Sequence, residues 1–211
     1  LVCFGSQNVL AATLTVTTNA DSGAGSLRQA VADATAGDTI TFDMNQVNSP
    51  ISLSNTLGRI FINKNLTING PGANLLTVQS SAQNFLNRVF IVGDATATIS
   101  GLTISGGIAA DGSRVGGGIG ISIPGTLNLT NSSVSNNNYN SIGGGIDNQG
   151  TLTVANSSIS NNKAGNNGGG IFNTGTLTVT NSTISGNWAS LTSTDGGGII
   201  NGGTLTVTNS T

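Results

Sequence analysis

Along much of the chain, single aliphatic residues alternate with Thr or Ser over short stretches, and Gly or Asn then interrupts the alternation. In the segment 176–180, Leu177 and Val179 fall on one side and the threonines fall on the other. A period of two residues is typical of a half-buried β-strand. Gly and Asn tolerate positive φ and therefore favour turns. The pattern predicts many short strands joined by tight turns.

The alternation recurs at a nearly fixed period in the C-terminal half. The motif GGGI begins at Gly116, Gly143, Gly168 and Gly196, and the motif GTL begins at Gly125, Gly150, Gly175 and Gly203. Each unit of about 25 residues holds about three strand-like segments that donate aliphatic side chains to one interior. Such a unit is too short for a propeller blade and lacks the spacing of a leucine-rich repeat. It corresponds to one coil of a parallel β-helix. The glycines of GGGI are expected at a tight corner where successive coils approach closely.

The remaining chain divides around these repeats. Residues 116–211 hold the regular repeats, the last of which breaks off in mid-repeat, and residues 44–115 read as less regular coils. Residues 13–43 are expected to form an N-terminal cap. The sequence thus predicts an all-β, right-handed parallel β-helix of about eight coils. The incomplete last repeat indicates either a fragment or an end that something else covers.

One segment of the cap, residues 26–35, has helical periodicity. Its apolar residues Leu27, Ala30, Val31 and Ala34 recur at helical spacing. Ser26 and Gln29 match a capping box at its start. We predict a short helix that covers the open end of the coil stack, where strand edges and core side chains would otherwise face solvent.

Residues 1–12 are mildly apolar and end in small residues, so two interpretations stay open. They are either the remnant of a secretory signal peptide or the first strand. The chain contains no apolar run of about 18 residues, so we expect no membrane-spanning segment within it.

The composition excludes several kinds of chemistry. The 211 residues include 32 Gly and no His, and only 7% are charged. Without His there is no Ser-His-Asp triad and no His-based metal site, and the single Cys3 excludes a disulfide framework. A net charge of -2 gives no electrostatic footprint for nucleic acid. We therefore expect no catalytic site, no metal and no cofactor.

Asn recurs at one position of each repeat, directly after the Leu-x-Val strand: Asn131, Asn156, Asn181 and Asn209. Stacked at the spacing of adjacent strands, these amides are predicted to form an internal hydrogen-bonded ladder. They also match the N-glycosylation pattern. The structural ladder is favoured because the position is locked to the register.

The only Tyr and the only Trp, Tyr139 and Trp188, fall in segments that interrupt the repeat. An exposed aromatic side chain there would stack on a sugar or anchor a partner. The alternative is that each ring packs over its own loop. Both residues are retained as candidate contacts.

Several stretches are also similar to a known group of proteins. These are VTTNADSGAGSLRQAVADATAGDTITFD (16–43), NLTINGPGANLLTV (65–78) and ISGLTISGG (99–107), together with the GGGI and GTLTVTNSTISGN units. They resemble bacterial secreted right-handed parallel β-helix proteins, and the units resemble the repeats of polymorphic outer-membrane proteins and adhesin passengers. The resemblance implies a secreted or cell-surface location and implies no particular activity.

Three classes of function stay open. The expected one is a non-catalytic structural or adhesive stalk outside the cell, which associates with itself, end to end into filaments or laterally, or binds a surface glycan or protein. The second is a polysaccharide lyase or hydrolase that uses turn carboxylates, namely Asp94, Asp111, Asp147 and Asp195. The third is a surface binder, as in ice-binding β-helices, that uses the threonine grid of residues 176–180 and 204–208.

Overall fold

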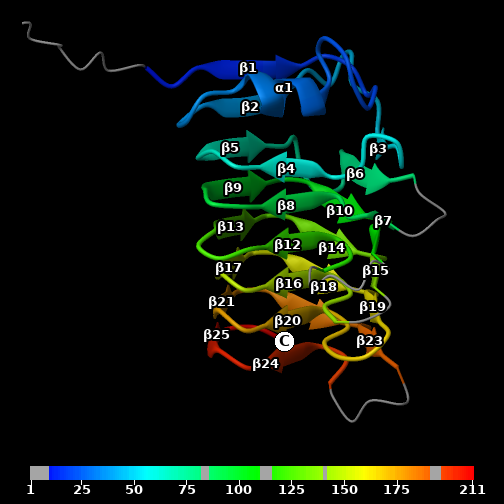
Figure 1. Cartoon of the computed structure of the whole chain (residues 1–211), viewed down its shortest axis with the longest axis vertical. Coiled ribbons are helices and arrows are strands. Elements are labelled where there is room, and N and C mark those ends of the chain that lie inside the picture. Colours follow the sequence, from blue (N-terminus) through cyan, green and yellow to red (C-terminus); the bar gives the residue numbers. More distant parts are fainter. Residues whose placement is uncertain (1–9, 82–85, 110–115, 140–141, 191–195) are drawn as a thin grey trace, which may run out of the picture.

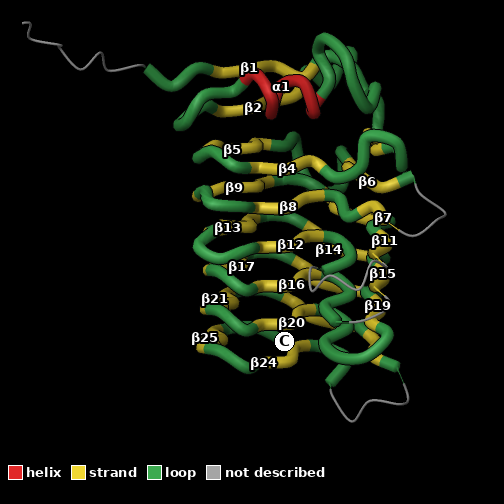
Figure 2. Tube along the Cα trace, in the orientation of Figure 1, coloured by secondary structure: helices red, strands yellow, loops and turns green. Residues whose placement is uncertain are grey.

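The computed structural model describes residues 10–81, 86–109, 116–139, 142–190 and 196–211. Within them the chain winds into a right-handed parallel β-helix of about seven turns, with a single helix at one end. Figure 1 shows the coils stacked along the long axis of the molecule, and Figure 2 shows that the strands of successive coils form columns separated by turns. The predicted fold class is confirmed, with about seven turns where about eight were expected.

The strands form four sheets, which a coil visits in the order 1, 2, 3, 4. Sheet 1 contains β1 (Thr13–Val16), β2 (Thr39–Phe42), β5 (Leu66–Asn69), β9 (Thr96–Ser100), β13 (Thr126–Thr130), β17 (Thr151–Ala155), β21 (Thr176–Thr180) and β25 (Thr204–Thr208). Sheet 2 contains β3 (Ile51–Leu53), β6 (Thr77–Ser80), β10 (Thr103–Ser105), β14 (Ser133–Ser135), β18 (Ser158–Ser160) and β22 (Thr183–Ser185).

The other two sheets complete the coil. Sheet 3 contains β7 (Leu86–Asn87), β11 (Ile108–Ala109), β15 (Asn138–Tyr139), β19 (Lys163–Ala164) and β23 (Trp188–Ala189). Sheet 4 contains β4 (Ile60–Ile62), β8 (Phe90–Val92), β12 (Ile119–Ile121), β16 (Ile146–Asn148), β20 (Ile171–Asn173) and β24 (Ile199–Asn201). Neighbouring strands pair in parallel, except that β7 and β11 are antiparallel. The two-residue strands of sheet 3 are too short to show an alternation, which is why the sequence predicts only about three strands per coil.

The core consists of columns of aliphatic side chains in register. In sheet 1, Leu127 pairs with Leu152, which in turn pairs with Leu177, and all three are fully buried. Equivalent side chains therefore lie about 4.8 Å apart along the axis, close enough for tight packing. The predicted inward side of the alternation is the buried side throughout these coils.

The N-terminal helix α1 (Leu27–Asp33) lies within the predicted range 26–35. The Ser26 hydroxyl accepts a hydrogen bond from the backbone N–H of Gln29 at 3.1 Å, as a capping residue should. In chain order α1 stands between β1 and β2, in the place of the strand that would precede β4 in sheet 4. Leu27 and Val31 enter the core, so the helix covers the sheet-4 side of the first coil (Figure 1).

The predicted asparagine ladder was wrong. Its four members are exposed and lie at φ 49°, namely Asn131, Asn156, Asn181 and Asn209. The chain must turn sharply after each five-residue strand, and Asn tolerates the left-handed conformation that this turn needs. The side chain consequently points outward. The next residue points inward instead: the backbone N–H of Ser132 donates to Ser157 Oγ at 3.1 Å, and Ser157 donates to Ser182 in the same way.

Two other asparagine columns form the internal ladders. In one, Asn137 Nδ2 donates to Asn162 Oδ1 at 2.9 Å, and Asn162 Nδ2 donates to Asn187 Oδ1 at 3.0 Å. The glycine corner makes room for this column, since a Cβ added at Gly145 would lie 2.9 Å from Asn162 Nδ2. The backbone of the GGGI corner therefore lies as close to the next coil as expected, and it also lies close to the buried amides.

The second column lies between sheets 4 and 1. Asn148 Nδ2 donates to Asn173 Oδ1 at 2.6 Å, and Asn173 Nδ2 donates to Asn201 Oδ1 at 2.6 Å. Asn148 begins this column because the preceding coil has Ile121 at the paired position. Its buried Oδ1 accordingly has no hydrogen-bond donor in the described part of the chain.

Replacing the middle member of the second column tests its contribution to stability. Asn173→Leu removes one donor and one acceptor and leaves Asn201 Oδ1 without its side-chain donor, so we expect the free energy of unfolding to fall by about 1–3 kcal/mol. Urea unfolding followed by circular dichroism measures the loss.

Asn201→Leu is the matched control, because Asn201 is exposed and water can replace its hydrogen bonds. It should cost less than about 1 kcal/mol. Equal losses for the two variants would contradict a buried ladder as the source of stability.

Candidate functional site

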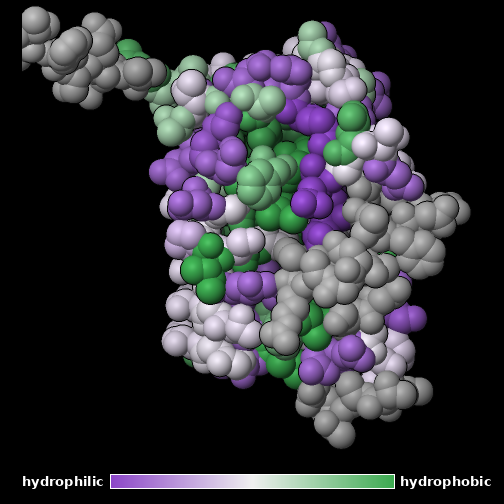
Figure 3. Space-filling view, in the orientation of Figure 1, coloured by the Kyte–Doolittle hydropathy of each residue, from purple (hydrophilic) through white to green (hydrophobic). Residues whose placement is uncertain are grey.

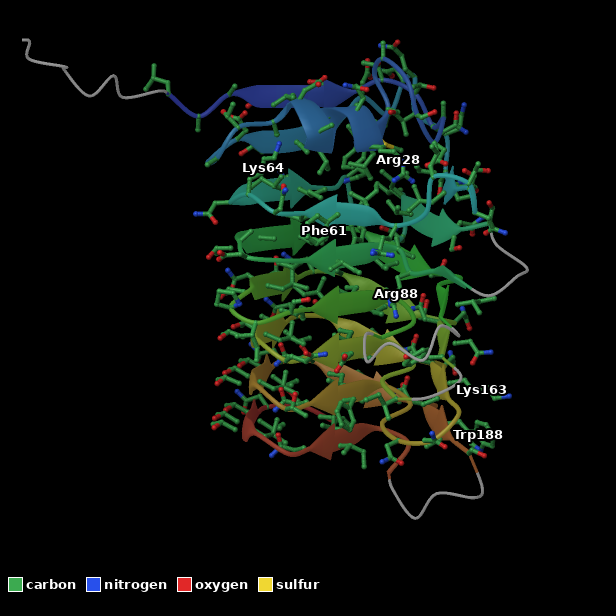
Figure 4. The ribbon with its side chains drawn as sticks, viewed as in Figure 1. Arg28, Phe61, Lys64, Arg88, Lys163 and Trp188 are labelled. Atoms are coloured by element: carbon green, nitrogen blue, oxygen red, sulfur yellow. The ribbon has the colours of Figure 1, made fainter. Side chains whose placement is uncertain are left out.

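The two predicted aromatic contacts have different surroundings. Tyr139 in β15 is 1% exposed, and the guanidinium carbon of Arg88 lies 6.0 Å from its ring centroid. Tyr139 therefore packs inside the molecule and is not an exposed contact. Trp188 in β23 is 40% exposed, and Lys163 Nζ lies 4.8 Å from its ring centroid. Trp188 remains available for a contact, on the outer side of sheet 3 (Figure 4).

The carboxylates of the enzyme alternative are dispersed where the structure describes them. Asp94 is exposed in the turn after β8. Asp147 is fully buried in β16, where its Oδ2 accepts a hydrogen bond from Gln149 Nε2 at 3.0 Å. Since β8 and β16 are separated by β12 in sheet 4, the two acids belong to non-adjacent coils. Asp111 and Asp195 lie outside the described residues.

A hollow of about 380 Å³ lies between α1 and β4, which the sequence motifs did not indicate. It is lined by Arg28, Val31, Ala32, Arg59, Ile60, Phe61, Asn63 and Lys64. We call it the cationic hollow, because three of its lining residues are Lys or Arg and none is Asp. In the space-filling view, hydrophobic and strongly hydrophilic atoms adjoin each other on this face below α1 (Figure 3).

The strand β4 forms the floor of the cationic hollow through its alternation. Ile60 and Ile62 are buried in the core, whereas Arg59, Phe61 and Asn63 are exposed. The Phe61 ring is 50% exposed and rests on the next coil, where a Cβ at Gly93 would lie 2.7 Å from Phe61 Cζ. The alternation of residues 59–63 is the signal that sequence reasoning could have used here.

Arg28 forms one wall of the hollow and is held by hydrogen bonds. Its guanidinium pairs with Asp21 at 2.7 Å and donates to the carbonyl oxygens of Gly58 at 2.6 Å and Arg59 at 3.0 Å. Burial raises the pKa of Asp21, but hydrogen bonds from Ser54 and Arg28 outweigh this effect and leave the pKa below its ordinary value. The ion pair thus ties α1 to the segment that leads into β4.

Lys64 forms the opposite wall. Its ammonium donates to the carbonyl oxygens of Ala32 at 2.9 Å and Ala34 at 2.7 Å. These groups lie at the end of α1, where a cation offsets the negative end of the helix dipole. Arg59 differs from both walls, because within the described ranges its guanidinium has no hydrogen-bond or ion-pair partner. Figure 4 shows Phe61 below and between Lys64 and Arg28.

A buried carboxylate holds the chain on either side of the helix. Asp38 is 3% exposed and accepts hydrogen bonds from the backbone N–H groups of Thr35 and Ala12, both at 2.7 Å. These bonds, with the Thr35 hydroxyl, lower the pKa of Asp38 despite its burial. The carboxylate of Asp38 is therefore ionised at neutral pH when the cap is folded.

The described residues contain neither a metal-binding cluster nor a membrane-spanning helix. No group of three or more His, Cys, Asp or Glu side chains there is placed to hold a metal ion. No described helix is long and apolar enough to cross a membrane.

Comparison with protein-family models, with curated proteins and with solved structures finds no match for this chain.

The lowered pKa of Asp38 predicts loss of stability in acid. The folded state holds the carboxylate charged more strongly than the unfolded state, so this contribution is present above about pH 4 and is lost as the pH falls through the folded-state pKa. Asp38→Asn should be less stable than the wild type at pH 7 and should lose less stability between pH 7 and pH 3. Thermal unfolding across that range measures both effects.

Asp94→Asn removes the same charge at an exposed turn and serves as the control. It should follow the wild-type pH profile. If Asp38→Asn showed the same dependence of thermal stability on pH as the wild type, the cap would not depend on this carboxylate.

Proposed function

We propose that the chain is a non-catalytic stalk of the cell exterior, a β-helix that holds binding residues on its outer faces. The observation that carries this proposal is that the buried polar side chains serve the structure, because the buried Asn and Ser residues form hydrogen bonds between one coil and the next. Asp21, Asp38 and Asp43 likewise accept hydrogen bonds that lower their pKa values. A general acid working near neutral pH needs a raised pKa instead.

The exterior location is supported by sequence alone. The cap segment 16–43 and the GGGI repeats resemble bacterial secreted β-helix proteins, including polymorphic outer-membrane proteins and adhesin passengers. A stalk that is rich in Gly, Asn, Ser and Thr has few sites for trypsin-like proteases, since the chain has only six Lys and Arg. This composition suits a protein exposed to such proteases.

An assay for glycan cleavage tests the non-catalytic part of the proposal. Incubated with polygalacturonate, xylan and β-glucan, the purified chain should release no new reducing ends and no unsaturated products. Release of either product that Asp147→Asn abolishes would overturn the proposal and favour the lyase or hydrolase alternative. Asp33→Asn is the control, because it removes an exposed carboxylate that is not among the candidates of the enzyme alternative.

The stalk also offers a surface for self-association at β25. Leu205 and Val207 are 36% and 50% exposed, whereas their paired residues Leu177 and Val179 in β21 are fully buried. An exposed strand edge with apolar inward residues is a template for pairing with another chain. We propose that second copies associate through this coil.

Sedimentation velocity tests the association. The wild type should show a mass that increases with concentration, and Val207→Lys should remain a monomer because the charge lies in the apolar column. Thr206→Lys adds the same charge on the opposite side of β25 and should still associate. A monomeric wild type, or equal loss of association in both variants, would overturn this mode of assembly.

A further inference from the structure

The cationic hollow has the features of a ligand site that the stalk itself does not require. Its volume of about 380 Å³ is within the range of small-molecule sites, about 300–1,000 Å³. Arg28 and Lys64 are needed to hold α1, but Arg59 has no partner within the described ranges, and Phe61 remains half-exposed although it lies beside buried Ile60. The exposed ring of Phe61 and the guanidinium of Arg59 lie in the same hollow, and neither is needed to hold α1 or the core.

The charge of the hollow points to an anionic ligand. It contains three of the six Lys and Arg residues of a chain whose net charge is -2. Asp21 neutralises Arg28 and the Asp38 carboxylate attracts Lys64, which leaves Arg59 as the cation of this lining that has no partner within the described ranges. A guanidinium presents paired donors that fit a carboxylate or sulfate, and the Lys64 ammonium has a third N–H beyond the two that bind helix carbonyls.

The remaining lining residues point to a sugar. Phe61 is half-exposed over Gly93 and supplies apolar ring surface in the same hollow as the cations. Asn63, which directly follows β4 and is exposed, has an amide that can both donate hydrogen bonds to hydroxyl groups of a sugar and accept them. A pyranose ring combines these needs, because it has an apolar face, hydroxyl groups around its edge and, in acidic sugars, one anionic group.

We propose that the cationic hollow binds an acidic sugar residue of a polysaccharide. The sugar ring stacks on Phe61, the anionic group pairs with Arg59 and Lys64, and a hydroxyl group hydrogen-bonds to Asn63. This inference names a partner class for the stalk and rests on the proposed function for its setting outside the cell.

Binding to defined polymers tests the inference. The whole 211-residue chain is titrated with polygalacturonate, dextran sulfate and neutral dextran of matched length, and affinity is measured by biolayer interferometry at low and at physiological salt. We expect binding to one or both anionic polymers, weakening with salt, and at least tenfold weaker binding to neutral dextran. The comparison of polygalacturonate with dextran sulfate distinguishes a carboxylate from a sulfate as the anionic group.

Matched variants locate the site. Arg59→Gln should weaken binding of the anionic polymer by about tenfold or more, since a charge-assisted hydrogen bond is lost. Phe61→Leu, which keeps an apolar side chain over Gly93 but removes the ring face, should weaken it by several-fold. Lys163→Gln removes one positive charge from sheet 3, on another side of the coil, and should change binding by less than twofold. Thermal unfolding checks that each variant folds as the wild type does.

Two results would overturn the inference. Equal effects of Arg59→Gln and Lys163→Gln would mean that the polymer responds to net charge and not to the hollow. Absence of binding to every polymer would remove the acidic sugar as the ligand. Neither result bears on the stalk proposal, whose test is the cleavage assay.

Discussion

The structure depends on one constraint, which is that the strands of one coil pair in register with those of the next, in parallel at every described pair except β7 and β11. In the parallel pairs, each strand residue lies directly over the residue at the same position of the neighbouring coil. A position must therefore suit contact with copies of itself. Leucine satisfies this requirement by packing, as in the column through Leu152, and asparagine satisfies it with an amide that donates on one side and accepts on the other, as Asn162 does.

The same constraint accounts for the unusual composition. Buried polar side chains are costly unless they are hydrogen-bonded, and a self-pairing amide meets this condition where a further Asn lies on both sides of it, as at Asn162 and Asn173. The glycines of the GGGI corner serve the arrangement as well, because a Cβ at Gly145 would meet Asn162 and the next coil. The few charged groups near the cap, such as the pair between Asp21 and Arg28, instead fasten the helix that interrupts the repeat.

The sequence predicted the fold because repetition and alternation are visible without coordinates. The helix was also predictable, since its apolar spacing and its Ser26 cap are local signals. The ladder was misplaced because register identifies which residues stack but does not say on which side of the wall their side chains lie. At Asn131 that side depends on a positive φ, which the sequence pattern does not show. The cationic hollow was missed for a related reason, since Arg28 and Arg59 meet only through tertiary contacts between the helix and the first strand of sheet 4.

The regular coils have a consequence for how the gene can vary. Asn137 makes the same contacts with Asn162 as Asn162 makes with Asn187, so one of these coils is a suitable neighbour for another. Duplicating or deleting one repeat would preserve the stacking at the junction and would change only the length of the rod, by about 4.8 Å for each coil. The cap and its hollow would be unaffected, because they lie at the opposite end of the stack (Figure 1). The number of coils and the structure of the cap can therefore change independently of each other.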